Sequence, residues 1–554
     1  MTVRLPFEPV LRRVGAEADR LGLAAYAVGG AVRDALLDRP TTDLDVVAVG
    51  PGSGIRLAEA VAKALKVKPP AVYEAFGTAA VTVPGPRLRA LVDDDAWADD
   101  DRLVLEFVGA RKESYRADSR KPVVEDGTLD EDLSRRDFTV NALAASLNAE
   151  TFGEVVDRFD GLADLEAKTL RTPLGPAVTF EDDPLRMVRA ARFAAQLGFE
   201  VADDAVAAMT EKAGRIEIVS MERVTDELHK LLAAPVPSVG LGLLFRTGLL
   251  EHVLPEVTAL AGVEEVGGRA HKDNFWHTLE VVDNLAHLQR GVGVGERADG
   301  YDLWLRWAAL LHDVGKEPTK RWEPGTGWTF HGHEFVGPKK MIPPIFRRLK
   351  LPLGDPLDFV QTVVRLHHRP AALVDSDVTD SAVRRLLFDA GDDIEDLMLL
   401  VRADVTSKNA RRVRRYLAGF DHVERRFEEV EARDRMRNWQ PPVDGDEIKQ
   451  KLDLPEGVAV GILKEWVREA VLEGEVPNEH GPAWAYVLER KDEALRRGAL
   501  FDEAVRQLRG PERRAIGAVK EALFWDDVPQ DEAGARERLR AVVAEALAED
   551  EGDA

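Results

Sequence analysis

The sequence predicts an α/β domain at the N-terminus, followed by a chain that is mostly α-helical. Near the N-terminus, helical stretches alternate with short runs rich in strand-forming residues, namely AYAVGG, LDVVAV, AAVTVP and LVLEFVG. Further along, apolar residues recur with the spacing of one helical face, as in LWLRWAALLHDVGK. Proline-rich joints mark candidate boundaries between the parts. We therefore predict four regions, covering residues 1–165, 166–238, 239–440 and 441–554.

The composition is typical of a globular protein with an acidic surface. Of 554 residues, 45% are hydrophobic and 31% are charged, and the formal net charge is -24. No run of about 18 apolar residues and no secretory leader is present, so we expect a cytoplasmic protein without a membrane partner. The absence of cysteine excludes disulfides and thiolate ligands. The chain contains basic runs such as RRVRRY, IFRRLK and RKESYRADSRK, so its negative net charge does not exclude a nucleic-acid partner.

Two aspartates stand one residue apart in the apolar run DLDVVAV. Side chains alternate between the faces of a strand, so Asp43 and Asp45 point the same way and Leu44 points the other way. Two ionised carboxylates repel each other and are costly to bury unpaired. A divalent cation relieves this repulsion, and Mg²⁺ prefers oxygen ligands with room left for phosphate. The pair therefore predicts a magnesium site for phosphoryl or nucleotidyl transfer. A half-exposed edge strand after a turn is the alternative.

The segment before the aspartates predicts a phosphate-binding site. Gly29 and Gly30 end a strand-like run and open the helical stretch VRDALL. Glycines at such a junction let backbone N–H groups approach a phosphate at the start of a helix. Arg33 adds a positive charge close by.

The spacing of these two features resembles the signature of the DNA polymerase β-like nucleotidyltransferase superfamily. The longer string GGAVRDALLDRPTTDLD is similar to the opening motif of class II CCA-adding tRNA nucleotidyltransferases and their poly(A) polymerase relatives. This resemblance implies a nucleotidyltransferase head with a mixed sheet over 1–165, and a helical neck for nucleotide selection and RNA binding over 166–238. It also implies Mg²⁺ at the head, and tRNA, CTP and ATP as partners.

The resemblance continues in LSRRDFTVNALA. In the family, the RRDFTxNA segment contacts the ribose and phosphates of the incoming nucleotide, which assigns this role to Arg135, Arg136, Asp137 and Asn141. The residue types suit the role, because arginines present forked donors to phosphate and an asparagine can bond to a ribose hydroxyl. Taken alone, RRD is also typical of a surface cluster of ion pairs.

FEDDPLRMVRAARF resembles the motif with which the family selects its nucleotide. Asp183 and Arg186 keep the key positions, and Arg189 follows one turn later. Residues three apart share a helix face, so a carboxylate acceptor and a guanidinium donor can meet one base edge together. Cytosine and adenine offer an amino donor beside a ring-nitrogen acceptor, whereas guanine and uracil would leave these groups unpaired. Asp183 before Pro184 also fits a helix N-cap with proline at the first helical position.

Between these motifs, LVLEFV places Glu106 on an expected strand. Glu106 is a candidate third carboxylate facing the metal, although an exposed strand glutamate is the commoner explanation. The stretch that follows, from RKESYR to DGTLDEDL, corresponds to a mobile loop that the family ties to switching from C to A addition.

A second group of candidate ligands lies in the helical part of the chain. Histidines occur in HTLEVVDN, LLHDVGK, FHGHE and RLHHRP, and RADVTSKN supplies a late aspartate. This pattern resembles the HD family of metal-dependent phosphohydrolases, which implies an HD domain over 239–440 that holds one or two divalent metals. The implied ligands are His277, His312, Asp313 and Asp404, with His333 and His367 for a second metal; His331 and His368 are weaker candidates, and Lys316 is a candidate phosphate contact.

The predicted function is addition of C and A to the tRNA 3′ end from CTP and ATP, without a nucleic-acid template, with an appended phosphohydrolase. The motifs equally fit an A-adding enzyme, a CC-adding enzyme or a bacterial poly(A) polymerase. A further alternative is chiefly an HD phosphohydrolase whose head only binds RNA, against which the intact Asp43 and Asp45 argue. The role of residues 441–554 and the oligomeric state are not predicted.

Overall fold

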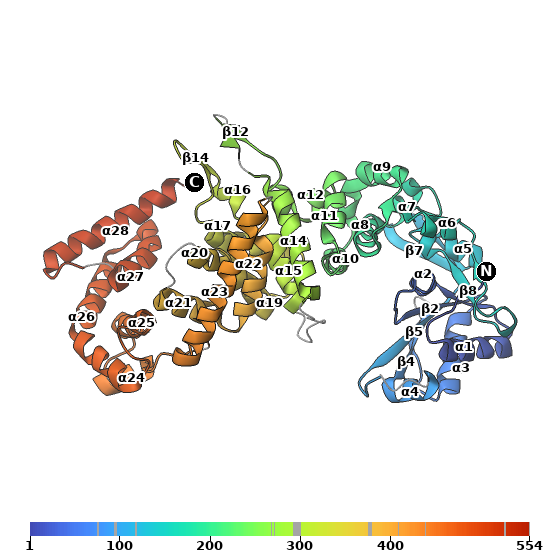
Figure 1. The fold of residues 1–554 in the computed structure, drawn as a ribbon, viewed down its shortest axis with the longest axis horizontal. Helices are drawn as coiled ribbons and strands as arrows, with labels where there is room; N and C mark the ends of the chain where they lie inside the picture. Colours follow the sequence, from blue (N-terminus) through green and yellow to red (C-terminus); the bar gives the residue numbers. More distant parts are fainter. Residues whose placement is uncertain are drawn as a thin grey trace. The chain divides into compact units, whose positions relative to one another are not determined.

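The structure is a computed structural model that describes residues 1–554 except 75–76, 93–96, 117–118, 267–268, 271, 292–300, 375–378, 408, 438, 526–527 and 553–554. The chain forms two compact units, Met1–Val364 and Arg365–Ala554 (Figure 1). Among the described residues, no helix combines the length and the apolar character that a membrane span needs.

A seven-stranded mixed sheet organises the N-terminal part, which confirms the predicted α/β head. The strand order is β3–β4–β5–β2–β1–β8–β9. The central neighbours β2 and β5 run parallel, and the other neighbours run antiparallel. The strands are β1 (Ala25–Val28), β2 (Asp43–Ala48), β3 (Ala71–Tyr73), β4 (Thr78–Pro84), β5 (Arg102–Gly109), β8 (Ala144–Ser146) and β9 (Val155–Val156).

Helices pack on this sheet through regular apolar stripes. In α3 (Ser53–Leu65), the fully buried Leu57, Val61 and Leu65 recur every fourth residue, so they form one face that contacts β4 and β5 (Figure 1). Each such side chain contributes about 1.5–3 kcal/mol through burial. Gly54 allows the close approach, because a Cβ there would lie 2.6 Å from the backbone nitrogen of Gly109. The other helices of this part are α1 (Glu8–Leu21), α2 (Gly30–Leu36), α4 (Gly85–Val92), α5 (Leu129–Ser134) and α6 (Gly161–Glu166).

The hairpin of β6 (Arg111–Arg116) and β7 (Ser119–Asp126) holds the basic run RKESYRADSRK. The side chains of residues 112–124 lie outside the described part of the structure, as do residues 117–118 altogether. The basic surface predicted for this run therefore stays a prediction, and so does the mobile loop.

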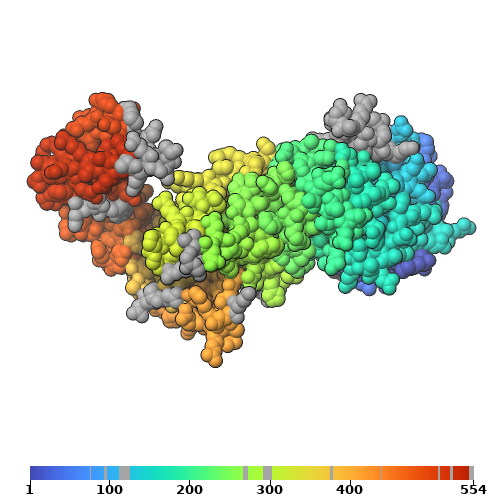
Figure 2. All heavy atoms as spheres, turned by 90° about the horizontal axis from the view of Figure 1, so that it is seen from above, coloured from blue at the N-terminus to red at the C-terminus, as the bar shows by residue number. Residues whose placement is uncertain are grey.

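The neck is helical, as predicted, and its helix α8 lies at the centre of its packing. Helix α8 contacts both α10 and α11, and Gly240 of α11 permits this, because a Cβ there would lie 2.5 Å from the carbonyl oxygen of Ala191. In the space-filling view, the head in blue and cyan and the neck in green form one continuous surface (Figure 2). The neck helices are α7 (Pro176–Asp182), α8 (Leu185–Leu197), α9 (Asp203–Lys212), α10 (Met221–Leu232) and α11 (Pro237–Arg246).

The rest of the chain is mostly helical, which also confirms the prediction. The helices that follow include α14 (Asn274–Gly291), α15 (Tyr301–Leu311), the short α17 (His333–Val336), α18 (Ile342–Arg348) and α19 (Asp355–Leu366), whose last two residues belong to the second unit. The second unit contains α20 (Arg369–Val374), α21 (Asp380–Ala390), α22 (Ile394–Asp404), α23 (Ala410–Asp434), α24 (Gly445–Leu452), α25 (Val458–Glu473), α26 (His480–Gln507), α27 (Ile516–Trp525) and α28 (Glu532–Gly552).

Three short strand pairs beyond the head were not expected from the sequence. They are β10 (Thr169–Leu170) with β11 (Glu200–Val201), β12 (Glu265–Val266) with β13 (Arg269–Ala270), and β14 (Arg321–Glu323) with β15 (Gly327–Thr329). Strands of two or three residues are too short to show an alternating apolar pattern, so they escape a search for strand periodicity.

Candidate active site and candidate metal centre

Strand β2 presents carboxylates on one face. Asp43 is exposed, Leu44 is buried and Asp45 is half-buried, so the side chains alternate along the strand. Strand β5 pairs with β2 in parallel register and sets Glu106 opposite Asp45. Burial raises the pKa of Asp45 to about 6, with a second contribution from the charge of Asp43 and a smaller one from Glu106. Arg136 offsets only part of this effect, and the remaining negative charge fits a divalent cation with oxygen ligands.

Gly29 brings an arginine close to this carboxylate face. It follows β1 and has a φ of 70° and a ψ of -130°, a backbone conformation that side chains other than glycine rarely adopt. A Cβ at this position would lie 2.9 Å from Nη1 of Arg136 and 3.8 Å from Oδ2 of Asp45. The absence of a side chain at Gly29 therefore leaves space for the guanidinium beside the carboxylates.

A fully buried aspartate on α5 orients the two adjacent arginines. Asp132 accepts from Nη2 of Arg135 at 2.7 Å through one oxygen and from Nη2 of Arg136 at 3.2 Å through the other. Burial alone would raise the pKa of Asp132, but the two guanidinium groups outweigh it and lower the pKa. Arg135 and Arg136 directly follow the end of α5, and their spacing of three and four residues from Asp132 lets both reach its carboxylate.

A chain of polar contacts links the head to the neck. Arg33 donates from Nη1 to Oδ1 of Asn141 at 2.7 Å, and Asn141 donates from Nδ2 to Oδ1 of Asp137 at 2.9 Å. The other oxygen of Asp137 accepts from Arg189 at 2.6 Å, and Arg189 donates to the buried Glu227 at 3.2 Å. These contacts join α2, the RRDFT segment, α8 and α10 into one network of hydrogen bonds and ion pairs, Arg33–Asn141–Asp137–Arg189–Glu227, which is called the relay below.

The two residues expected to select the base each have protein partners. One carboxylate oxygen of Asp183 accepts from Nη2 of Arg223 at 2.9 Å, and the other accepts from the backbone nitrogen of Leu185 at 3.2 Å. Arg186 is buried and donates to the carbonyl oxygen of Arg135 at 2.6 Å. The assigned helix α8 begins at Leu185, one residue later than expected, but the bond from the backbone nitrogen of Leu185 to Asp183 is the one that an N-cap aspartate accepts, so the predicted capping role of Asp183 is confirmed.

With the exception of Glu106, which is exposed on β5, the predicted head residues line one cavity of about 1160 Å³. They are Gly29, Gly30, Arg33, Asp43, Asp45, Arg135, Arg136, Asp137, Asn141, Asp183, Arg186 and Arg189. Nine arginines and lysines and five aspartates line the cavity, so its charge is the reverse of the chain's net charge. The volume slightly exceeds the ~300–1,000 Å³ usual for small-molecule sites, and it suits a polyanionic ligand together with a second reactant.

Farther along the first unit, three histidines converge on one aspartate. The Nε2 atoms of His312 and His277 lie 3.3 and 3.8 Å from Oδ2 of Asp313, and Nε2 of His333 lies 3.6 Å from Oδ1. All four side chains are buried. His277, His312 and Asp313 offer ligand atoms within 4.8 Å of one another, and this set of two imidazoles and one carboxylate fits a transition metal.

Backbone carbonyls orient two of these rings. Nδ1 of His312 lies 2.8 Å from the carbonyl oxygen of Ala309, and Nδ1 of His333 lies 2.8 Å from that of Phe330. A carbonyl only accepts, so each ring carries its proton on Nδ1, and Nε2 becomes the ligand atom.

Two lysines border the cluster. Nζ of Lys316 donates to Oδ2 of Asp313 at 2.7 Å, and Nζ of Lys272 lies 2.8 Å from Nδ1 of His277. Ammonium groups beside the metal ligands suit an anionic phosphate ester as the substrate.

The remaining predicted ligands belong to the second unit. His367 is buried after the end of α19, and its ring centroid lies 4.0 Å from that of the exposed His368. Asp404 is half-buried at the end of α22. Their membership of the metal centre stays a prediction. His331 lies in the first unit and is exposed, two residues before His333.

Three family descriptions match successive parts of the chain. "Poly A polymerase head domain" covers residues 25–171, "Probable RNA and SrmB- binding site of polymerase A" covers 198–260, and "HD domain" covers 274–408. The A-adding tRNA nucleotidyltransferase of Deinococcus radiodurans is 34% identical over 359 residues, which are 63% of this chain and 76% of that protein. The multifunctional CCA protein of Pseudomonas paraeruginosa is 35% identical over 334 residues, 59% of this chain and 70% of that protein.

The chain belongs to the tRNA nucleotidyltransferase family. A crystal structure of the Bacillus stearothermophilus CCA-adding enzyme in complex with CTP is similar in fold, with a TM-score of 0.58 and 25% identity. The matched region covers 89% of this chain and 100% of the Bacillus stearothermophilus chain. The family resemblance and fold class predicted from the motifs are thereby confirmed, and the matched HD domain makes the chain a nucleotidyltransferase with a second, metal-dependent phosphohydrolase module.

Several residues of this tRNA nucleotidyltransferase were missed by sequence reasoning. Asp132 and Glu227 hold the arginines of the cavity, and Arg192, Arg223 and Lys230 line its wall. Only Asp132 gave a local signal, because it stands three and four residues before a pair of arginines. The neck residues acquire their partners through the packing of α8 on α10.

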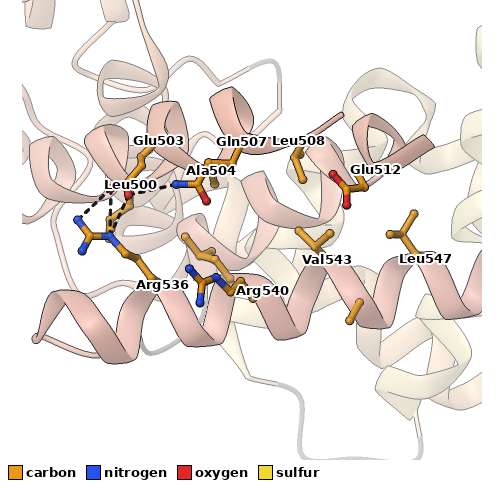
Figure 3. A pocket seen from close by; sticks show the side chains of 12 residues that line it. Leu500, Glu503, Ala504, Gln507, Leu508, Glu512, Arg536, Arg540, Val543 and Leu547 are labelled. Atoms are coloured by element: carbon orange, nitrogen blue, oxygen red, sulfur yellow. Dashed lines mark hydrogen bonds and ion pairs between the residues drawn. The ribbon is translucent and has the colours of Figure 1, made fainter. Parts of the chain in front are cut away.

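The C-terminal helices of the nucleotidyltransferase enclose a separate cavity of about 400 Å³. Leu500, Ala504 and Leu508 face Val543 and Leu547 across it (Figure 3). An ion pair of 3.0 Å between Glu503 and Arg536 lies among the lining side chains. Seven of the twelve lining residues are apolar, in contrast to the cationic lining of the head cavity.

Proposed function

We propose that this protein adds C and A to the 3′ end of tRNA, using CTP and ATP without a nucleic-acid template. The observation that supports the proposal is the single cavity in which the carboxylates of β2, the glycine junction, the paired arginines and the Asp183–Arg186 motif meet. No single motif defines nucleotidyl transfer, but this combination provides separate groups for a cation, a triphosphate and a base.

The reacting end of the nucleotide belongs beside β2. Asp43 and Asp45 would hold Mg²⁺, which when bound offsets the charge of the phosphates and polarises the α-phosphate for attack by the tRNA 3′-hydroxyl. Arg135 and Arg136, held by Asp132, face the same cavity and present forked donors to the triphosphate. Pyrophosphate is the leaving group of this transfer.

Asp183 and Arg186 supply the base selection. A carboxylate accepts from the amino group of cytosine or adenine, and a guanidinium donates to the adjacent ring nitrogen. Their present partners, Arg223 and the carbonyl of Arg135, already satisfy both side chains. When a base binds, Asp183 and Arg186 exchange these hydrogen bonds for bonds to the base. With guanine or uracil, both side chains would lose their present partners and gain no replacement.

Addition of A alone is a second candidate function. It is favoured by one observation, the 34% identity to an A-adding enzyme, which nearly equals the 35% identity to a multifunctional CCA protein. The motifs described above are compatible with both activities.

The deciding experiment supplies purified protein with Mg²⁺, labelled CTP or ATP, and tRNAs that end before CCA, after CC or after CCA. We expect C and A on the first tRNA, A on the second, and arrest after one complete CCA. Addition of A to the CC-ending tRNA only would replace the proposal by an A-adding enzyme, and long A tracts would replace it by a poly(A) polymerase.

We further propose that the HD module hydrolyses phosphate esters at RNA ends, such as a terminal phosphate or a 2′,3′-cyclic phosphate. The convergence of His277, His312 and His333 on Asp313 supports a bound divalent metal other than Mg²⁺, because imidazole favours transition metals. Metal analysis after loading with Mn²⁺, Co²⁺ or Ni²⁺, followed by hydrolysis assays on both kinds of RNA end, tests this. Failure of every metal to bind stoichiometrically would overturn it.

A further inference from the structure

Helix α23 begins with four arginines that face solvent. Arg411, Arg412, Arg414 and Arg415 are exposed, and they stand in the first six residues of a helix of 25 residues. The side chain of Asn409 accepts from the first backbone nitrogens of the helix at 3.0 and 3.3 Å. The helix end is thus already capped, and any affinity for anions must come from the guanidinium groups. The helix lies after the last of the three matched family regions.

These arginines differ from their neighbours in their partners. Among the described residues, no carboxylate lies within 4.0 Å of Arg411, Arg412 or Arg414. In the second half of the same helix, by contrast, Arg426 and Arg433 both bind Asp380. Aspartate and glutamate outnumber lysine and arginine by 99 to 75 in this chain, so three exposed arginines that lie within five residues and have no carboxylate nearby among the described residues form a localised positive surface.

The arrangement opposes the stability of the helix. Arginines in the first turn face the positive end of the helix dipole, where acidic residues are favourable. Arg411 repels Arg414 and Arg415 across three and four positions, and Glu428, Glu429 and Glu431 stand near the negative end. Helix stability therefore does not explain the order of charges along α23, whereas a requirement for an exposed positive surface does.

An aromatic ring lies within this surface. The guanidinium carbons of Arg412 and Arg415 lie 5.7 and 5.1 Å from the ring centroid of the half-buried Tyr416. A cation–π contact orients an arginine without neutralising its charge, unlike a carboxylate. Forked donors held in this way match phosphate oxygens.

We infer that Arg411, Arg412, Arg414 and Arg415 form a binding surface for the phosphate backbone of the RNA substrate. The inference rests on the proposed function, because tRNA is taken as the partner. An RNA is favoured over an acidic protein because regularly spaced phosphates match closely spaced guanidinium groups, and because one matched region of this chain is described as a probable RNA-binding site.

The test compares two full-length triple variants with the parent. One is Arg411→Gln/Arg412→Gln/Arg414→Gln, and the other is Arg425→Gln/Arg426→Gln/Arg433→Gln, which removes the same charge from the other half of α23. The dissociation constant of a tRNA transcript that ends before CCA is measured by fluorescence anisotropy from 50 to 300 mM KCl. Thermal unfolding and the addition of C and A are measured on the same proteins.

We expect the first variant to bind about tenfold more weakly at low salt, with a log–log salt slope shallower by about 2 to 3. Its melting temperature should equal or exceed that of the parent, because like charges leave the wrong end of a helix dipole. The control variant should keep the slope. Unchanged binding and slope in the first variant, with addition of C and A intact, would overturn the surface alone. Equal salt slopes for the two variants would show a general effect of charge and would also overturn the proposed surface. The proposal would likewise be overturned if an acidic protein, but not an unlabelled RNA, weakened the binding of the labelled tRNA. Absence of nucleotide addition in the parent would instead refute the proposed function.

Discussion

The head and the HD module of this protein each assemble a candidate metal site, but they use different ligands and different supports. The head offers the carboxylates of Asp43 and Asp45 in an open, cationic cavity, whereas the HD module buries three imidazoles around Asp313. Oxygen ligands with spare coordination positions suit Mg²⁺ and phosphate, and imidazoles suit transition metals. We therefore expect the two sites to prefer different metals.

The supports differ in the sequence distance they span. In the HD module, carbonyls three residues earlier orient His312 and His333. In the head, Asp137 depends on Arg189, and Arg189 depends on Glu227, which stands on another helix. The candidate HD ligands His312 and His333 are thus oriented by local backbone geometry, while Asp137 and Arg189 of the head cavity rely on the tertiary packing of distant ion pairs.

The largest expected effect separates the two chemistries. Replacement Asp45→Ala removes a proposed ligand of Mg²⁺ in the head and should lower nucleotide addition at least about 10³-fold, as expected for the loss of several kcal/mol of charge stabilisation. Hydrolysis by the HD module should not change. Radiolabelled CTP incorporation and phosphate release are measured on the same preparation, and parallel loss of both activities would contradict two independent sites.

The reciprocal replacement sharpens the comparison from the other side. Since His312 is fully buried and supplies one of the converging Nε2 atoms, His312→Ala should weaken Mn²⁺ or Ni²⁺ binding by more than about 100-fold. Nucleotide addition should stay at the parental rate. The exposed His331 gives the matched control, because His331→Ala should retain the metal. Metal content is read by mass spectrometry, and retention of metal by the His312 variant would argue against this centre.

The contrast in supports also explains what could be predicted from the sequence. The spacing of Asp43 and Asp45 follows from strand alternation, and His312 and Asp313 are adjacent in one motif, so local sequence suffices for both. The same holds for the α/β head and the helical remainder, whose apolar periodicities are long. The family resemblance added the roles of Asp183 and Arg186, which residue types alone leave open.

The relay and its partners could not be predicted in this way. Glu227 lies 38 positions from Arg189 and stands in an ordinary amphipathic helix, where a glutamate normally faces solvent. Its burial follows from the packing of α10 on α8, which no periodicity specifies. Arg223 likewise gains its role only when α10 brings it to Asp183. Long-range ion pairs thus need the tertiary structure before they can be recognised.

A break in the relay should affect the head without affecting the HD module. Asp137→Asn removes the charge that holds Arg189 and should lower the free energy of unfolding of the head by about 2 kcal/mol, the usual size for a charge-assisted hydrogen bond. Urea unfolding followed by circular dichroism measures the loss. Equal stability of variant and parent at neutral pH would show that the relay is not important for folding.

The difference in the free energy of unfolding between the parent and the Asp137→Asn variant should become smaller at acidic pH. Burial raises the pKa of Asp137, but Arg189 outweighs burial, and the pKa of the folded state lies below the ordinary value of about 3.9. The carboxylate therefore stabilises the fold fully at a pH above about 4, and this contribution declines as the pH falls toward the folded pKa. Stability measured from pH 7 to pH 3 should show the parent converging on the variant, and a constant gap would exclude a role of ionisation.

The smallest expected effect concerns selectivity. Arg223→Ala removes the partner that fixes one oxygen of Asp183, so the carboxylate loses orientation, and discrimination of CTP and ATP against GTP and UTP should fall about three- to tenfold. Arg215→Ala is the matched control, since Arg215 binds the nearby Glu181 instead, at 2.8 Å. The ratio of kcat/KM values for the four nucleotides is the measurement. Unchanged or increased selectivity in the Arg223 variant would show that the neck does not orient the carboxylate of Asp183. The contribution of the neck would then be limited to the contact between Glu227 and Arg189.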